Sequence, residues 1–234
     1  RNIFSGRINL LETTSDNAFS LVQLAIKRTE RMYYDPMTKI LNRGSIFEAL
    51  EEKSDADSNS FPLSVFMLDI DHFKSINDFC GHQFGDQILI AVSGIMAFSL
   101  RTCMDTAREA DLFGRVGGEE FLCVYSNTDL INAAKAAERL RAEIAGSEEI
   151  SHILQSQHPD FFRKNITISG GVFTYYPWMN LPVEKIVKLA DEGLYYSKKS
   201  GRNKITSVFY DSGSGITGLF ETDEVIKMQN NKIV

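Results

Sequence analysis

The sequence predicts an α+β fold, in which a central, mostly antiparallel sheet of five strands is flanked by helices and preceded by an N-terminal helix. Apolar runs of strand length alternate with segments of helical periodicity. Residues 63–71 form an almost continuous apolar run that ends in carboxylates, as expected of a buried central strand. Gly117-Gly118 joins two short strand-like runs, which indicates a hairpin. The resulting βαββαβ order usually forms an antiparallel or mixed sheet with helices covering one face.

The N-terminal segment predicts a single helix over residues 8–33. Its apolar residues recur at intervals of seven, the spacing of helices that pack against a partner helix, at Phe4, Leu11, Ala18, Ala25 and Met32. Two arrangements remain open, because polar residues interrupt the alternate apolar positions. Either the helix packs on its own domain, or it forms a dimeric coiled coil that passes a signal from an upstream sensor domain.

The next segment predicts a break at Asp35-Pro36 and then a short amphipathic helix at residues 45–52. Beyond the central strand, the apolar positions from Asp86 onward follow helical spacing, after a Gly-rich turn. Residues 146–165 interrupt the regular pattern without a motif that can be interpreted. The remaining predicted elements are strands at residues 112–116, 121–125, 166–174 and 204–210 and helices at residues 129–144 and 183–199.

These elements divide the chain into three parts. The N-terminal signalling or linker helix covers residues 1–33, the main domain covers residues 34–210, and a C-terminal tail of unassigned role covers residues 211–234. The tail begins with Ser212-Gly213-Ser214-Gly215, a composition typical of a flexible joint. Its later apolar residues predict packing on the domain or on a partner.

Composition and charge exclude several classes of protein. The 234 residues are 43% hydrophobic, enough for one sizeable core, and the net charge of −6 argues against a general nucleic-acid or anionic-membrane surface. The longest apolar run, residues 88–100, is too short to span a bilayer. Three widely spaced cysteines, Cys80, Cys103 and Cys123, predict free thiols in a reducing, cytoplasmic compartment. The first residue is Arg, which suggests a fragment of a longer protein that could be tethered to a membrane.

Four carboxylates are candidates for a cation site. Asp69 and Asp71 end the central strand, and Glu119 and Glu120 follow the Gly-Gly turn, so pairing of these strands would gather the acids at one sheet edge. Carboxylates in close array repel one another and either take up protons or bind a hard divalent ion, and Mg²⁺ favours one or two carboxylates together with substrate phosphates. The alternative is four exposed acids on separate loops.

Four motifs, in order, resemble those of one enzyme family. Residues 117–121, Gly-Gly-Glu-Glu-Phe, resemble the signature of the GGDEF family of diguanylate cyclases in its GGEEF form. Residues 69–86 resemble the nucleotide-binding segment of that family, residues 35–43 its opening motif and residues 190–203 its closing motif. The resemblance covers residues 33–210. It implies a palm-like fold related to class III nucleotide cyclases, and condensation of two GTP into cyclic di-GMP with release of pyrophosphate.

The resemblance also implies a metal site and a proton acceptor. Asp69, the main-chain carbonyl of Ile70 and Glu119 would hold Mg²⁺, with Mn²⁺ as the alternative ion. This ion polarises the α-phosphate of GTP and helps the 3′-hydroxyl to ionise. Glu119 is also the implied proton acceptor, and Glu120 and Lys74 complete the implied catalytic set.

The implied contacts with GTP divide between the phosphates and the base. The main-chain amides around His72 and Phe73, with basic side chains, would cradle the triphosphate and offset its charge. Side chains of the same segment would read guanine, and His82 either lies near that pocket or is an ordinary turn residue. The residues assigned to GTP by the resemblance are His72, Phe73, Lys74, Asn77, His82, Asp86, Lys198 and Arg202.

Two further implications concern assembly and regulation. Each subunit of a transient antiparallel homodimer would carry one GTP. Arg108-Glu109-Ala110-Asp111 matches the RxxD inhibitory motif of the family at the usual distance from Gly117, and Arg139 matches a position that in some relatives completes this site from a neighbouring subunit. Cyclic di-GMP is therefore expected to be both product and inhibitor.

An alternative function is a catalytically weak GGDEF module that serves as a receptor for GTP or cyclic di-GMP. Degenerate members of the family usually lose the signature acids, whereas Asp69, Glu119 and Glu120 are all present here. A third possibility, a cyclase that makes mixed dinucleotides, would be favoured by a small neutral residue at position 86. The sequence has Asp86.

Overall fold

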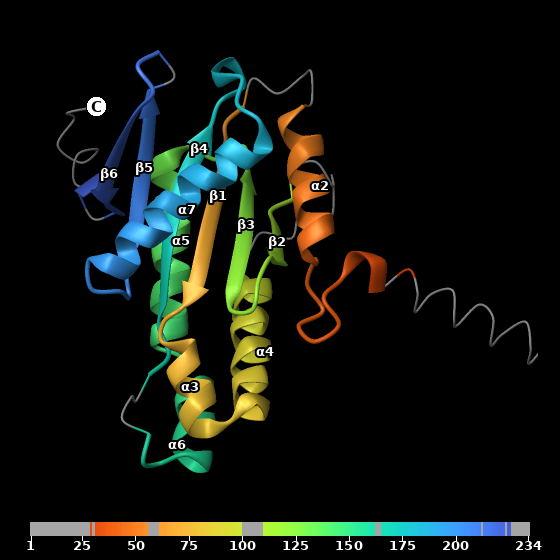
Figure 1. Ribbon diagram of the computed structural model, residues 1–234, viewed down its shortest axis with the longest axis vertical. Helices are drawn as coiled ribbons and strands as arrows, with labels where there is room; N and C mark the ends of the chain where they lie inside the picture. The colour runs from red at the N-terminus through yellow and green to blue at the C-terminus, as the bar shows by residue number, and fades with distance from the viewer. Residues whose placement is uncertain are drawn as a thin grey trace, which may run out of the picture.

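One mixed sheet of six strands forms the centre of the protein (Figure 1). The computed structural model describes residues 29, 31–55, 61–99, 110–161, 165–211, 213–222, 224 and 225. The strand order is β2-β3-β1-β4-β5-β6, and neighbouring strands are antiparallel except for the parallel pair β4 and β5. The strands are β1 (Leu63–Ile70), β2 (Leu112–Arg115), β3 (Glu120–Ser126), β4 (Ile168–Tyr175), β5 (Ile205–Asp211) and β6 (Ile216–Glu221).

The predicted α+β architecture is confirmed, but the predicted count of five strands is wrong. The additional strand, β6, begins just after the segment expected to be a flexible joint. The carboxylate of Asp211 accepts hydrogen bonds from the main-chain N of Gly213 at 2.9 Å and from the hydroxyl of Ser214 at 2.6 Å, and Gly215 has a φ of +70°. These contacts build a tight turn, so the chain reverses and β6 pairs with β5 as a new edge of the sheet.

Helices cover both faces of the sheet, whereas the element order predicted one covered face. The reason lies in β1 and β4, in which every residue is buried. Val65 packs in one core and Phe66 in the other, so each face of β1 needs its own helical layer. The helices are α2 (Arg43–Ser54), α3 (Phe73–Cys80), α4 (His82–Ser99), α5 (Leu130–Ala145), α6 (Glu148–Gln157) and α7 (Val183–Lys199), with a 3₁₀ turn, η1 (Pro177–Met179).

The two cores define the layers. One core packs α2 and α7 against the sheet, and the other packs α4, α5 and α6 against the opposite face. Figure 1 shows α7 crossing in front of the strands, α5 behind them, and α3, α4 and α6 toward the lower end of the sheet. Two of these helices, α3 and α6, were not predicted, and α4 begins at His82 rather than at Asp86.

The ends of the chain are described only in part. The helix predicted over residues 8–33 lies outside the described residues except for Thr29 and residues 31–33, which are helical. The side-chain amide of Asn42 donates to the carbonyl O of Met32 at 2.7 Å, and its side-chain oxygen accepts from the main-chain N of Ser45 at 3.0 Å. Asn42 therefore caps α2 and joins it to the end of the N-terminal helix.

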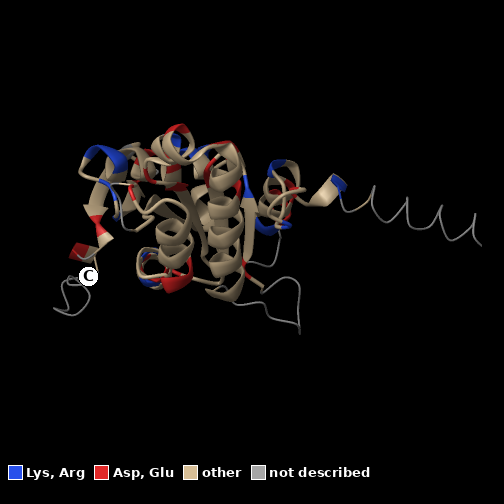
Figure 2. Cartoon of the chain, turned by 90° about the horizontal axis from the view of Figure 1, so that it is seen from below, with Lys and Arg blue, Asp and Glu red and all other residues tan. Residues whose placement is uncertain are grey.

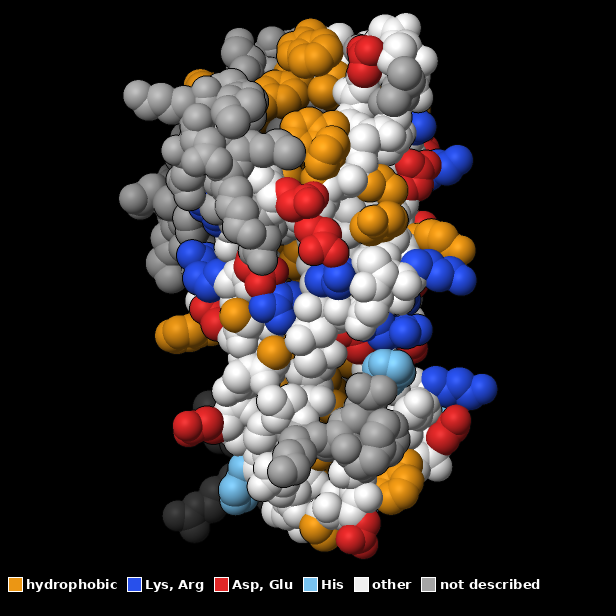
Figure 3. All heavy atoms as spheres, turned by 90° about the vertical axis from the view of Figure 1, so that its left-hand side faces the viewer, with side chains coloured by type: hydrophobic (Ala, Val, Ile, Leu, Met, Phe, Trp, Pro, Cys, Tyr) orange, Lys and Arg blue, Asp and Glu red, His pale blue; other side chains and the backbone are white. Residues whose placement is uncertain are grey.

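Acidic and basic residues are interspersed along the described part of the chain (Figure 2). On the side that carries β5 and β6, acidic and basic side chains lie next to one another across the middle of the face, with hydrophobic side chains above them (Figure 3). This mixture agrees with the modest net charge of −6. No described helix has the length and hydropathy needed to cross a bilayer.

Candidate active site

The C-terminal end of β1 lies beside the turn that joins β2 to β3. Asp69 is opposite Glu120 in the antiparallel register, and the main-chain N of Ile70 donates to the carbonyl O of Glu119 at 3.3 Å. A register that pairs these two strands brings the acids of the turn to the acid of the strand end. The structure therefore gathers Asp69, Glu119 and Glu120 at one edge of the sheet.

Asp69 is the buried member of this group. It is 4% exposed, and the Nζ of Lys198 lies 2.7 Å from its Oδ2. Burial raises the pKa of Asp69 to about 6, the Lys198 ammonium opposes that rise, and the charges of Glu119 and Glu120 add to it. Burial also raises the pKa of Glu119 above its ordinary value. These acids lack sufficient positive charge around them, so the group favours a cation.

Asp71 has a different environment from the other three acids. It is buried, and its carboxylate accepts hydrogen bonds from the hydroxyls of Thr167 and Ser169, each at 2.7 Å, and from the main-chain N of Asn203 at 2.9 Å. A carboxylate with three donors is satisfied by the fold itself. Asp71 therefore orients the loop after α7 against the end of β1 rather than adding to the cation site.

Arg115 holds the turn that carries the acids. Its guanidinium donates to the carbonyl O of Gly117 at 3.2 Å and to that of Gly118 at 2.7 Å. The same group reaches the carboxylate of Asp35 at 3.4 Å, and this interaction helps to lower the pKa of that acid. A Cβ on Gly117 would come within 2.3 Å of the Oε2 of Glu120, so a larger residue there would displace the Glu120 carboxylate. Arg115 thus holds the turn through its two carbonyls and joins it to Asp35.

The N-terminus of α3 follows β1 directly. His72 precedes this helix with a φ of +59°, and no side-chain hydrogen bond caps the helix. The first amides of an α-helix have no acceptor within the helix, so those of Phe73 and Lys74 are suited to an anion. The ring of Phe73 is buried in the core, and the side chain of Lys74 is exposed. Phe73 can therefore contact a ligand through its main chain alone, whereas Lys74 can also use its side chain.

The corner between α3 and α4 carries the predicted guanine-reading residues. Gly81 makes this corner with a φ of +86°, a conformation that favours glycine. A Cβ on Gly85 would lie 2.0 Å from the Oδ1 of Asn77, so the Asn77 side chain rests against the backbone of α4. The next residue is Asp86, which is exposed, as is His82 at the start of α4. The structure brings Asn77 and Asp86 together from two helices.

The closing segment after α7 supplies the basic residues. Lys198, in the last turn of α7, pairs with Asp69, and Arg202 follows with a φ of +65°. The main-chain N of Arg202 donates to the carbonyl O of Ser197 at 3.0 Å, and the Arg202 side chain is exposed. The backbone of this loop is therefore fixed, while the Arg202 guanidinium is available to a ligand.

The acids fit a magnesium ion that is shared with phosphate. Across the described part of the chain, no three His, Cys, Asp or Glu side chains form a complete metal site on their own. Mg²⁺ usually keeps several waters and takes one or two carboxylates together with substrate phosphates. Asp69 and Glu119, with the carbonyl of Ile70 as a further oxygen, suit that donor set. Lys198 supplies the positive charge beside Asp69 in the structure described here.

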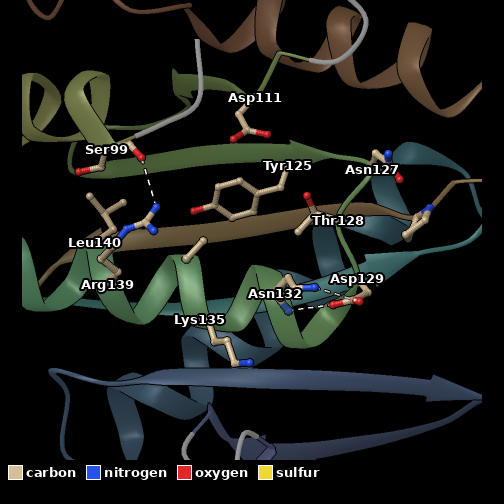
Figure 4. Close-up of a pocket in the computed structure, with 12 residues that line it drawn as sticks. Ser99, Asp111, Tyr125, Asn127, Thr128, Asp129, Asn132, Lys135, Arg139 and Leu140 are labelled. Carbon is tan, nitrogen blue, oxygen red and sulfur yellow. Dashed lines mark hydrogen bonds between the residues drawn. The ribbon is translucent and has the colours of Figure 1, made fainter. Parts of the chain in front are cut away.

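A cavity of about 570 Å³ lies away from these acids, between β3 and α5 (Figure 4). Asp111 and Arg139 line it, and Tyr125 lies between them. The guanidinium of Arg139 donates to the carbonyl O of Ser99 at 3.4 Å, and the carboxylate of Asp111 accepts from the main-chain N of Ser126 at 3.3 Å. Two residues of the predicted inhibitory site thus share one cavity, while Arg108 lies outside the described residues.

Sequence reasoning missed Arg115 and Asn203. Arg115 precedes the turn by two residues, but its partners include Asp35, which is 80 residues away in sequence. Asn203 acts through its main-chain N, which carries no signal of residue type. An arginine at the end of a strand that leads into a Gly-Gly turn is the one signal that could have indicated Arg115.

Comparisons with known proteins agree with this geometry. Residues 32–204 match the family described as "Diguanylate cyclase, GGDEF domain". The chain is 37% identical over 173 residues to the Escherichia coli K12 protein named "Probable diguanylate cyclase DgcT", covering 73% of this chain and 34% of that protein. It is 35% identical over 201 residues to "Diguanylate cyclase A" of Treponema denticola, covering 82% of this chain and 49% of that protein. The chain thus spans between about a third and half of these two relatives.

Solved structures show the same fold. The coiled coil and GGDEF domain of DgcB from Caulobacter crescentus, solved in complex with c-di-GMP, superposes with a TM-score of 0.68 at 23% identity, covering 84% of this chain and 96% of that one. The active GGEEF domain of a diguanylate cyclase from Vibrio cholerae gives a TM-score of 0.57 at 30% identity, covering 71% of this chain and 96% of that one. The fold, the acid cluster and the sequence match agree, and the chain belongs to the GGDEF family of diguanylate cyclases.

Proposed function

We propose that this chain condenses two molecules of GTP into cyclic di-GMP in a reaction that depends on Mg²⁺. The observation that carries the proposal is the buried carboxylate of Asp69, which lies beside Glu119 and Lys198 and next to the uncapped N-terminus of α3. Carboxylates for a metal and amides for phosphate therefore adjoin. GGDEF cyclases generally need a divalent metal, and Mg²⁺ suits these oxygen donors, with Mn²⁺ as a second candidate.

In each of the two condensations, the 3′-oxygen of one GTP attacks the α-phosphorus of the other. The bond from the α-phosphorus to the bridging oxygen breaks, and pyrophosphate leaves. Glu119 accepts the proton of the 3′-hydroxyl, a role that its raised pKa favours at neutral pH. When bound, Mg²⁺ would polarise the α-phosphate and make the hydroxyl more acidic. Glu120 adjoins Glu119 and adds to the negative charge that retains the metal.

The triphosphate would lie along the N-terminus of α3. The main-chain amides of Phe73 and Lys74, after His72, point toward anions placed there. Lys74, Lys198 and Arg202 balance the charge that develops on the phosphates. Mg²⁺ would compete with Lys198 for Asp69, and the phosphates would compete with Asp69 for Lys198. The ion pair seen here would therefore loosen when substrate binds.

The guanine base would lie at the corner between α3 and α4. The Asp86 carboxylate can accept hydrogen bonds from guanine N1–H and N2–H, whereas adenine presents a lone pair at N1, which leaves the carboxylate unpaired. Asn77 adds an amide to the same pocket, and His82 lies at its rim. This pairing of one acid with two donors would select GTP over ATP.

Assembly and regulation extend the proposal. One domain offers one GTP site, so the reaction requires a homodimer in which two sites face each other. A sensor domain elsewhere in the full-length protein would control that dimer, because the relatives are two to three times as long as their matched regions. Cyclic di-GMP would inhibit through Arg108, Asp111 and Arg139, two of which line one cavity.

Product analysis tests the proposal. The purified protein is incubated with GTP and Mg²⁺, and the nucleotides are separated by chromatography. We expect cyclic di-GMP and pyrophosphate, and no cyclic dinucleotide with ATP alone. A protein that binds GTP or cyclic di-GMP but forms no product, under conditions in which it dimerises, would be a receptor rather than a cyclase.

A further inference from the structure

We propose that helix α6 positions the corner between α3 and α4, and so tunes the recognition of guanine. The proposal rests on the function proposed above, because it assigns Asn77 and Asp86 to the base. It concerns a segment, residues 148–157, for which the sequence suggested no role.

Three contacts join the last residue of α6 and the segment that follows it to this corner. The ring of Phe161 lies 5.4 Å from that of Phe79, and the ring of His158 meets that of Phe84 edge to face at 4.6 Å. The side-chain amide of Gln157 donates to the Oε1 of Gln87 at 3.2 Å. All three contacts therefore come from residues 157–161, which are the last residue of α6 and the four residues after it.

The partners on the corner lie one or two positions from the guanine-reading residues. Phe79 follows Asn77 by two positions, and Phe84 and Gln87 lie on either side of Asp86. Residues one or two positions apart on a helix share one stretch of backbone, so a shift of these side chains moves the readers as well. The end of α6 therefore fixes the backbone from which Asn77 and Asp86 project.

The C-terminal half of α3 has little support of its own, whereas the α4 side of the corner is held in the core by Phe84. Helix α3 has 8 residues, of which only Phe73 and Ile76 are buried, and both lie toward its N-terminal half. Phe79, near the other end, is 54% exposed and rests on Phe161. Figure 1 shows α3 projecting below the sheet beside α6 and the lower end of α4. A short helix held mainly at one end needs a second support at the other.

Helix α6 can provide that support because it is anchored in the core. Ile150 and Leu154 are each 1% exposed, and Phe161, just after the helix, is 5% exposed. Ser147 caps α6 by accepting a hydrogen bond from the main-chain N of Ile150 at 3.2 Å. The helix thus links the corner to the same core as β1, which carries Asp69.

The consequence is specific to nucleotide binding. Loosening the corner would weaken the contact with guanine and leave the acids at Asp69 and Glu119 in place, since these are held by β1 and by the turn. We therefore expect KM for GTP to rise while kcat at saturating GTP stays nearly constant. The advantage of GTP over ITP, which lacks the 2-amino group read by Asp86, would shrink.

The test compares two histidines of one segment. His158→Ala removes the edge-to-face contact with Phe84, and His152→Ala, at an exposed position of α6, is the matched control. Binding is measured with 3′-deoxy-GTP and 3′-deoxy-ITP, which lack the attacking hydroxyl and cannot be condensed, alongside KM and kcat with GTP. His158→Phe keeps an aromatic ring at the contact and tests for rescue.

We expect His158→Ala to weaken binding of 3′-deoxy-GTP by about threefold to tenfold, the range for loss of one aromatic contact. Binding of 3′-deoxy-ITP should weaken less, kcat should change by less than about twofold, and His158→Phe should recover most of the affinity. His152→Ala should match the wild type. Unchanged affinity in folded His158→Ala, or equal losses for both nucleotides, would overturn the role of α6. A wild type that binds neither nucleotide would overturn the proposed function as well.

Discussion

The proposed function places two demands on the carboxylate of Glu119, which would hold a cation and also accept a proton. Glu119→Gln keeps the shape of the side chain but removes both abilities. We expect product formation to fall on the order of 10³-fold or more, the range for removal of a preorganised charge-stabilising group. Product is measured by chromatography, and folding by circular dichroism.

Glu51→Gln, on the exposed surface of α2, is the control for the change of charge and should retain full activity. Binding of 3′-deoxy-GTP to Glu119→Gln should survive, because the guanine contacts lie on α3 and α4. Near-normal turnover by folded Glu119→Gln would remove Glu119 from the mechanism.

Asp69 makes the stability of the metal-free protein depend on pH. Its pKa is about 6 in the folded chain against an ordinary value of 3.8, so the folded state binds more protons than the unfolded state between these values. The free energy of unfolding should therefore fall as pH rises through this window, by at most about 3 kcal/mol. Asp69→Asn, unfolded by urea in the presence of a chelator, should lack this fall.

Asp35 provides a control of the opposite sign. Its pKa is lowered by hydrogen bonds with Thr38 and by the charge of Arg115, although burial opposes the shift. Its stabilisation is present above the ordinary pKa and is lost as pH falls, so Asp35→Asn should flatten the acidic end of the profile instead. Identical pH profiles for wild type and Asp69→Asn would show that Asp69 is not the titrating group.

Under the proposed function, Gly85 serves guanine recognition rather than the stability of the helix. Alanine is favoured over glycine inside a helix by about 1 kcal/mol, but the new Cβ would lie 3.1 Å from the Cζ of the buried Phe73 ring. We expect these effects to offset each other, so the thermal midpoint of Gly85→Ala should stay close to that of the wild type. Its Cβ would occupy the place of the Asn77 Oδ1, 2.0 Å away, and the flexible amide would rotate out of the pocket. We expect KM for GTP to rise about fivefold or more, the cost of one lost hydrogen bond.

An unchanged KM for GTP in Gly85→Ala would show that Asn77 does not contact the base. Gly94→Ala, also in α4 with open space around its Cβ position, is the control.

At the level of elements, most strands and helices were predictable, and the ones that were missed were α3, α6 and β6. The strand at residues 63–71 was evident because burial on both faces demands a continuous apolar run, and the structure has β1 there. Helix α3 gave a weak signal, since only Phe73 and Ile76 are buried along it. Strand β6 was missed because Gly and Ser suggest flexibility, whereas the Asp211 carboxylate organises the turn.

The candidate site shows the same division. The meeting of Asp69 with Glu119 and Glu120 could be predicted, because it follows from the pairing of β1 with β3. The ion pair of Lys198 with Asp69 could not, since it depends on how α7 crosses the sheet. The three hydrogen bonds to the Asp71 carboxylate could not be predicted either, since they depend on where β4 and the loop after α7 lie in the fold.

The β2–β3 turn depends on the planar fork of Arg115. Arg115→Lys keeps the charge but offers a single ammonium, which cannot reach both turn carbonyls and Asp35 together. The turn would loosen and Glu119 would lose its fixed place beside Asp69. We expect kcat to fall about tenfold, with a smaller change in KM, because the guanine and phosphate contacts lie elsewhere.

Asp35→Asn separates the two functions of Arg115, because it weakens the ion pair and leaves the carbonyl contacts intact. This variant should lose less activity than Arg115→Lys. If kcat of folded Arg115→Lys equals that of the wild type, the arginine serves stability alone.

At the scale of the whole molecule, the cavity and the acids lie at opposite ends of β2, so the proposed inhibitor site and the proposed catalytic site are separate. Asp111 immediately precedes β2, and the opposite end of that strand, at Arg115, leads into the turn that carries Glu119. A ligand of Asp111 and Arg139 therefore binds a full strand away from the metal site, and it should inhibit noncompetitively with GTP. Arg139 is well placed for an anionic dinucleotide, since its side chain is 59% exposed at the cavity.

Arg139→Ala should therefore weaken inhibition by cyclic di-GMP while leaving the initial rate close to that of the wild type. An arginine that binds phosphate through two charge-assisted hydrogen bonds is worth a factor of about ten or more in the inhibition constant. Arg108→Ala should act in the same direction, because the RxxD motif contributes both Arg108 and Asp111.

Lys188→Ala, which removes an exposed cation on α7, is the control for the loss of one charge. Cyclic di-GMP is titrated into each protein at several GTP concentrations. Superimposable inhibition curves for wild type, Arg139→Ala and Arg108→Ala would mean that the product inhibits by occupying the GTP site, and inhibition competitive with GTP would accompany that result.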